Sequence, residues 1–305
     1  MTYQVQFLRE LKAHGFLEIV MRQETKRDFT LYYHDIFEYP LTDEEVTVWQ
    51  PGKKLGGELK KRVETEKKGG YSFLKGKGRL VEERRERESI SKRKIEMAKR
   101  GVGFISTIPT VKMVALTGAL AMSNAKVDSD IDIFIICKGG TLWATRMFTI
   151  FLLDIFGIPR NAGGKVDKDK LCLNMWLDER DLIWGRTDRN FYTAHEIAQI
   201  IPLVNKRGTY ERFIFVNRWI KDYWPNAVKI LSEEDTKILV GKSKKNHLIS
   251  KYLSILVSLL FEPIAFRLQY FYMKSKITRE VVTPTRAIFH PRDWGKIVMK
   301  RLTQV

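Results

Sequence analysis

The stretch VKMVALTGALAMSNAKVDSDIDIFIIC, residues 111–137, decides the fold of this chain. Residues 111–116 are mostly apolar and end at Thr117-Gly118, which predicts a buried strand. The next residues, ALAMSNA (119–125), are typical of a short helix, and a polar segment then leads into a second apolar run, IDIFIIC (131–137). The order strand, glycine, helix, strand is therefore expected at the centre of the fold.

Two carboxylates stand at the start of the second predicted strand. Asp130 and Asp132 are two positions apart, and because side chains alternate along a strand, both project to the same side. Adjacent carboxylates repel unless a cation lies between them, and hard oxygen ligands suit Mg²⁺. Gly118, at the exit of the first strand, lets the backbone approach a phosphate closely. The sequence thus predicts a site for Mg²⁺ and a phosphate group.

These residues resemble the signature of the nucleotidyltransferase superfamily of the DNA polymerase beta type. That signature is a hydrophobic residue, Gly, then Gly or Ser, a spacer, and Asp-hydrophobic-Asp or Glu; its counterpart here is Gly118-Ala119, ten residues, and Asp130-Ile131-Asp132. The resemblance covers about residues 90–180. It implies an α+β fold whose mixed sheet carries helices on one side. It also implies transfer of a nucleoside monophosphate from an NTP to a hydroxyl acceptor, with pyrophosphate leaving.

The resemblance also implies roles for single residues. Asp130 and Asp132 would hold Mg²⁺, and the backbone of Gly118 and Ala119 would cradle the triphosphate. Ala119 departs from the signature, because it offers no hydroxyl to a phosphate oxygen. Ser123, one helical turn further on, is the candidate substitute and is expected to bind substrate.

A third carboxylate is expected on a later strand, and KLCLNMWLD (170–178) is the candidate. Alternation places Cys172, Asn174 and Asp178 on one face of this strand. Asn174 stands where a mid-strand acid is expected, and an amide cannot serve as a base. Asp178 has the right phase but lies at the strand end. Three alternatives stay open: Asp178 is the third catalytic acid, two carboxylates suffice, or activity is weakened.

Residues 1–81 are predicted to form a separate N-terminal module. Its expected elements are a helix ended by Pro40, a helix capped by Thr42 with Glu45 in a capping box, a third helix over 55–67 and a hairpin over 71–81. Three helices followed by a hairpin resemble a winged helix, whose hairpin is the wing. The hairpin residues that would meet phosphates are Lys75, Lys77 and Arg79.

The remaining chain divides into two further parts. Residues 82–180 are the predicted nucleotidyltransferase core, which begins with a charged, solvated connecting helix over 82–100. Residues 181–305 are predicted to form a helical C-terminal region, similar to the helical substrate-side domain of several members of this superfamily.

Charge and cysteine content bear on partners and compartment. The net charge of +18 favours polyanionic partners such as nucleic acid. The two cysteines, Cys137 and Cys172, lie in apolar runs as small hydrophobes, which indicates a reducing compartment. No secretory signal is expected, and charges interrupt the apolar stretches 142–156 and 252–273, so no membrane span is predicted. A cytoplasmic location follows.

The favoured function is therefore a Mg²⁺-dependent nucleotidyltransferase that takes an NTP. Its acceptor is an RNA 3′ end, a protein hydroxyl or a small molecule, and the basic ends of the chain favour RNA. The alternative is a catalytically lapsed core that acts as a nucleic-acid-binding or regulatory module. An adapter built on the winged helix leaves the two carboxylates unexplained. The sequence predicts no oligomeric state.

Overall fold

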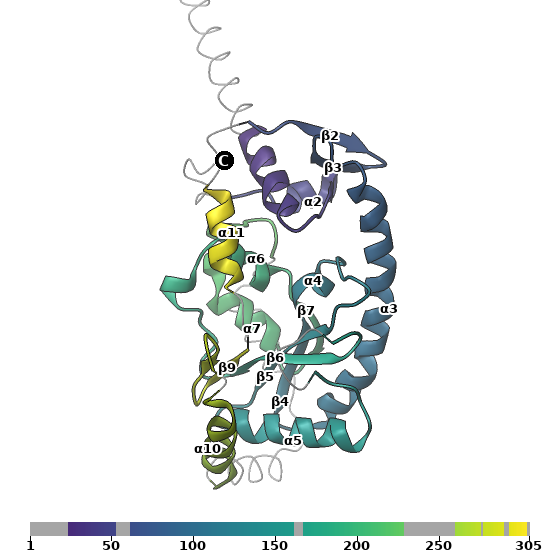
Figure 1. Ribbon diagram of the computed structural model, residues 1–305. Coiled ribbons are helices and arrows are strands. Elements are labelled where there is room, and N and C mark those ends of the chain that lie inside the picture. The colour runs from purple at the N-terminus through teal and green to yellow at the C-terminus, as the bar shows by residue number, and fades with distance from the viewer. Residues whose placement is uncertain are drawn as a thin grey trace, which may run out of the picture.

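The computed structural model describes residues 24–52, 62–161, 167–228, 260–275, 277–289 and 293–303. In these residues the fold is α+β, as predicted: a mixed six-stranded sheet, a small antiparallel sheet and the helices around them (Figure 1). None of the helices within the described ranges is long and apolar enough to cross a membrane.

The larger sheet has the strand order β7-β4-β5-β6-β9-β8 in the described residues. Its strands are β4 (Val111–Leu116), β5 (Ile131–Cys137), β6 (Leu171–Asp178), β7 (Ile201–Asn205), β8 (Val281–Val282) and β9 (Arg286–Ile288). Only the pair β5–β6 is parallel among these neighbours. The predicted strands 111–116 and 131–137 are confirmed, and the predicted strand 170–178 is confirmed from residue 171 onward.

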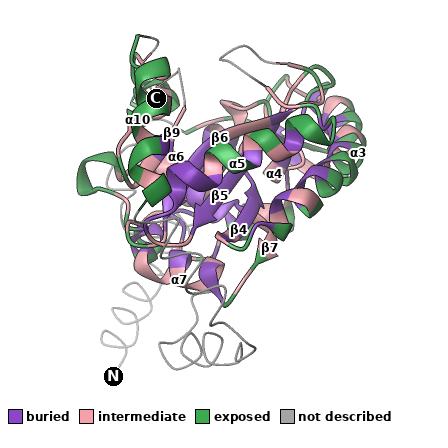
Figure 2. Cartoon of the chain, turned by 90° about the horizontal axis from the view of Figure 1, so that it is seen from below, coloured by how far each residue is buried: buried purple, intermediate pink, exposed green. Residues whose placement is uncertain are grey.

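Helices cover both faces of this sheet. One face packs on α3 (Leu80–Thr107), α5 (Leu142–Ile155) and α10 (Glu262–Met273). The other packs on α6 (Phe191–Ala198), α7 (Thr209–Val216), the 3₁₀ helix η3 (Arg218–Asp222), α11 (Trp294–Leu302) and the helical residues 24–35. The expectation of helices on one side is therefore wrong. Both faces of β4 and β5 are apolar, and the two strands are buried (Figure 2).

The region 181–305 is not purely helical. It contributes β7, β8 and β9 to the larger sheet. β8 and β9 hold two and three residues, which is too short for a period-two pattern to show in the sequence. Its other short elements include the 3₁₀ helix η2 (Arg186–Asp188).

The small sheet corrects the predicted hairpin. β1 (Leu41–Thr42), β2 (Thr65–Lys68) and β3 (Tyr71–Leu74) pair in the order β1-β3-β2. The hairpin turn is Gly69-Gly70, with φ of 59° and 88°, so β3 pairs with the residues before it. Residues 80–81 begin α3 instead. The third helix is predicted over residues 55–67. Its last residues, 65–67, are not helical because residues 65–68 form β2, and its residues 55–61 lie outside the described residues.

The capping prediction for α2 (Asp43–Val48) is confirmed. The Thr42 hydroxyl accepts a hydrogen bond from the Glu45 amide, and the Glu45 carboxylate accepts one from the Thr42 amide. The three basic residues assigned to a wing lie between β3 and α3. Each lies near an acid: Lys75 with Glu64 and Lys77 with Asp35, both at 2.6 Å, and Arg79 with Glu83 at 3.9 Å.

α3 connects the small sheet to the larger one along one side of the molecule (Figure 1). It is not simply solvated: Arg84, Arg87, Ser91 and Lys94 form a buried polar stripe at helical spacing. Arg84 donates to Glu45 at 2.8 Å, and Arg87 donates to Asn124 at 3.2 Å. The sequence shows the charges of this helix but not their partners, which come from distant segments.

Candidate functional site

The site lies where β4 ends beside the start of β5. These strands are antiparallel, with Leu116 opposite Ile133, and the Thr117 amide donates to the Asp132 carbonyl oxygen at 3.2 Å. Gly118 follows with φ of 61°, and a Cβ at this position would lie 2.6 Å from the Asp132 Oδ2 atom. Both the backbone conformation and the contact disfavour a side chain at position 118.

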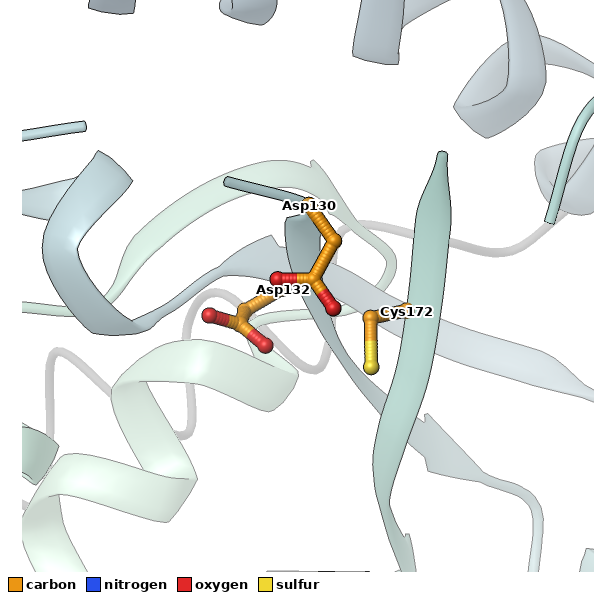
Figure 3. A group of neighbouring side chains, drawn as sticks. All are labelled: Asp130, Asp132 and Cys172. Atoms are coloured by element: carbon orange, nitrogen blue, oxygen red, sulfur yellow. The ribbon is translucent and has the colours of Figure 1, made fainter. Parts of the chain in front are cut away.

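Asp130, Asp132 and Cys172 point into one space (Figure 3). One ligand atom from each, two carboxylate oxygens and a sulfur, lie within 4.8 Å of one another. All three side chains are partly buried. The structure thus brings the predicted carboxylate pair together and adds a thiol that is expected, from the sequence, to be a small hydrophobe.

Asn174 completes this group from the same strand as Cys172. Its Nδ2 atom donates to the Asp132 Oδ1 atom at 2.5 Å. The residue is only 6% exposed, and its Oδ1 atom has no hydrogen-bond partner among the described residues. A buried amide oxygen without a partner costs roughly 1–3 kcal/mol. A cation or a cation-bound water beside Asp132 would supply that partner.

Asp178 does not belong to the site. The register pairs Asp132 with Cys172 and Cys137 with Asp178, which places Asp178 five β5 residues, or about 17 Å at the usual rise per residue, from Asp132 along the strand direction. It is fully buried, and its carboxylate accepts hydrogen bonds from the Gly140 amide at 2.6 Å and from Arg180. The prediction of Asp178 as the third acid is therefore corrected.

The reason is a bulge in β6. Asp132 pairs with Cys172 but Phe134 pairs with Met175, so β6 has one more residue than β5 in this interval. The extra residue reverses the alternation, and Trp176 packs with the apolar cluster on the opposite face. Alternation from Cys172 consequently holds as far as Asn174 and fails beyond it.

A different acid lies near the pair. Glu196 is on α6. Burial and the charge of Asp132 raise its pKa to about 8, although the hydrogen bond that Gln199 donates to it acts to lower the pKa. Tyr192, one turn earlier, also has a raised pKa, first from burial and then from Glu196 and Asp132. Glu196 is not among the site residues predicted from the sequence. Its signal is the one acid in the segment FYTAHEIAQI (191–200), which holds no Lys or Arg.

Burial and mutual repulsion act against the charged forms of this group. Burial and the neighbouring Asp130 carboxylate raise the pKa of Asp132 to about 7, while the hydrogen bond from Asn174 opposes this. Burial and the same two carboxylates raise the pKa of the Cys172 thiol. A divalent cation would offset the repulsion between these groups.

α3 positions the loop that carries Asp130. The Lys94 side chain is fully buried, and its Nζ atom donates to the Ser129 carbonyl oxygen and to the Asp169 carboxylate, both at 2.6 Å. Asn161 donates to the Asp130 Oδ2 atom at 3.2 Å. These contacts fix the Asp130 carboxylate next to β6.

The two remaining predicted site residues lie on α4 (Gly118–Ala121) and just after it. Ala119 follows Gly118 directly, and the Thr117 side chain makes no capping hydrogen bond to this helix. Ser123 lies in the turn after α4 with φ of 55°, and its amide donates to the Leu120 carbonyl oxygen. Within the described residues, Ser123 makes no hydrogen bond to either carboxylate.

Comparison with models of known protein families and with curated protein sequences yields no match to this chain.

Proposed function

We propose that this chain is a Mg²⁺-dependent nucleotidyltransferase that transfers a nucleoside monophosphate from an NTP to a hydroxyl acceptor. The observation that carries the proposal is the approach of Gly118 to Asp132. A glycine in a left-handed conformation brings bare backbone against a carboxylate, next to a second carboxylate, as a shared metal and phosphate site requires.

The donor set fits Mg²⁺. Asp130 and Asp132 offer carboxylate oxygens, and Asn174 offers an orphaned buried amide oxygen. Bound there, Mg²⁺ would neutralise phosphate charge and orient the triphosphate. The backbone of Gly118 and Ala119 would hold the phosphates against these residues.

Glu196 is proposed as the base that takes the proton of the acceptor hydroxyl. It interacts with Asp132, and its pKa of about 8 lies near neutral pH, where a general base works best. With Glu196 as the base, an active enzyme needs no acid at position 174.

RNA is the proposed acceptor. The chain has a net charge of +18. Lys112 near the start of β4 and Lys138 just after β5 lie at the opposite end of these antiparallel strands from the two site carboxylates. Burial lowers the pKa of Lys112, and the negative charge of Glu179 acts to raise it. The positive charges of Arg207 and Lys138 lower this pKa further, which indicates that the basic groups lie close together. Residues 24–74 also hold two of the three helices expected of a winged-helix module, followed by a two-stranded hairpin. Affinity for RNA should fall steeply with added salt.

The test is transfer of label from each α-labelled NTP to RNA, protein or small-molecule acceptors in the presence of Mg²⁺. Asp130→Asn and Asp132→Asn should reduce transfer at least about a hundredfold, because they remove several kcal/mol of charge stabilisation. Asp128→Asn is the matched control, since Asp128 is exposed in the same loop. Transfer that survives in both site variants contradicts the proposal, whereas binding of RNA without transfer identifies a lapsed enzyme.

A further inference from the structure

The two cysteines of the chain occupy opposite ends of neighbouring strands and differ in their surroundings. Cys137 is fully buried at the end of β5 within an apolar cluster. Cys172 lies at the start of β6, opposite Asp132 in the parallel register, and belongs to neither apolar cluster. Its sulfur is grouped with one oxygen of Asp130 and one of Asp132 within 4.8 Å. Packing alone accounts for Cys137, but it does not account for Cys172.

A second observation points to a ligand in this space. Asn174 is more than nine-tenths buried and contacts Asp132, yet its Oδ1 atom has no hydrogen-bond partner in the part of the chain that the structure describes. Native proteins pair nearly all such atoms with protein, water or an ion. The two carboxylates and the thiol lie close enough to share a cation. The amide oxygen of Asn174, whose Nδ2 atom contacts Asp132, adds a buried oxygen that lacks a partner.

The chemistry of the sulfur decides which cation. Mg²⁺ prefers oxygen ligands, whereas a thiolate selects softer ions such as Zn²⁺. We propose that Asp130, Asp132 and Cys172 form a mixed carboxylate–thiolate site that binds thiophilic divalent cations in competition with Mg²⁺. The thiol proton leaves to solvent when the sulfur binds the ion. This inference extends the metal site of the proposed function and rests on it.

Titration of the full chain with Cd²⁺ tests the inference without any measurement of activity. Wild type should show the ultraviolet charge-transfer absorption of a cadmium–thiolate bond. Cys172→Ala and Cys172→Ser should lose it and bind Cd²⁺ at least about tenfold more weakly, since even loss of an outer-shell partner weakens metal binding tenfold or more. Cys137→Ala is the matched control and should retain the absorption. Mn²⁺ binding, measured by electron paramagnetic resonance, should change little in the Cys172 variants.

The outcomes separate this inference from the proposed function. If the absorption is absent in wild type or persists in both Cys172 variants, while Mn²⁺ binding still depends on Asp132, the mixed site is wrong and the proposed function stands. If no divalent cation binds wild type, both fail. Thermal unfolding of each variant without metal shows whether it is folded, and Cys172→Ser keeps the side-chain volume closest to that of cysteine.

Discussion

Glu196 and Asp132 come from different elements, yet their charges interact, and burial keeps the pKa of Glu196 near 8. We expect Glu196→Gln to lower transfer about a hundredfold or more, because an amide cannot accept the proton of the acceptor hydroxyl. NTP binding should change little. Steady-state transfer rates, together with a direct binding measurement, check this.

Glu211→Gln on α7 is the control, since the Glu211 carboxylate binds Asn205 instead. A wild-type rate in Glu196→Gln would remove Glu196 from the mechanism. It would leave the carboxylate pair as the whole acidic site.

The Asp132 carboxyl has a pKa of about 7, well above the ordinary value of 3.8. The folded chain therefore binds more protons at this group than the unfolded chain, and stability decreases as pH rises from about 4 to 7. Asp132→Asn should raise the free energy of unfolding at pH 8 without divalent cation, by on the order of 1 kcal/mol or more. Near pH 4 the difference should vanish. Chemical denaturation at both pH values tests this.

The bulge in β6 is the element that the sequence does not reveal. Alternation along 170–178 correctly turns Cys172 and Asn174 toward the carboxylates, but the extra residue in β6 moves Asp178 to the other face. Only the partner strand shows that an extra residue is present, because a bulge depends on pairing between two segments. The strands themselves are predictable, since β4 and β5 are apolar runs bounded by polar residues.

Asp178 has a structural role at the end of β6. Its buried carboxylate accepts hydrogen bonds from the Gly140 amide and from Arg180. Asp178→Ala should therefore destabilise the fold by roughly 1–3 kcal/mol, because it leaves the Gly140 amide unpaired. Cation binding by the folded variant should equal that of wild type. A weakened cation site in folded Asp178→Ala would contradict this assignment.

At the scale of the whole molecule, the N-terminal residues and the core share one apolar interior. Phe29 lies 4.7 Å from Phe191 between ring centroids, and Tyr33 lies 5.0 Å from Trp224. The predicted division at residue 81 follows the expected order of three helices and a hairpin, but the sequence cannot show that aromatic residues so far apart pack together. Likewise, the partners of the buried arginines on α3 follow from tertiary packing alone.

His34 and His195 lie inside this shared interior, with ring centroids 5.2 Å apart. Burial lowers the pKa of His34 to about 4 and that of His195 well below its ordinary value. The unfolded chain thus binds more protons, so these groups make stability fall as pH decreases from about 6.5 toward 4. Each histidine changes the free energy of unfolding by about 1.4 kcal/mol per pH unit in that interval.

His195→Phe should make the free energy of unfolding less dependent on pH, by about 1.4 kcal/mol per pH unit, because one of the two buried histidines is removed. Chemical denaturation of wild type and variant between pH 7.5 and 5 measures this pH dependence. The contribution of the carboxylates is common to both proteins and drops out of the difference. Equal slopes would show that His195 is charged or solvated in the folded chain.

The outer edge of β6 has a consequence for synthesis of the chain. β9 pairs with that edge but lies roughly a hundred residues later in the sequence. At about 5–20 residues per second, a ribosome exposes the unpaired edge for on the order of 5–20 seconds before Arg286 emerges. Such an apolar edge is a template for pairing with other chains. A nascent chain stopped before Arg286 should therefore aggregate or bind chaperones, which light scattering and crosslinking would detect, whereas one that extends through Ile288 closes its own edge.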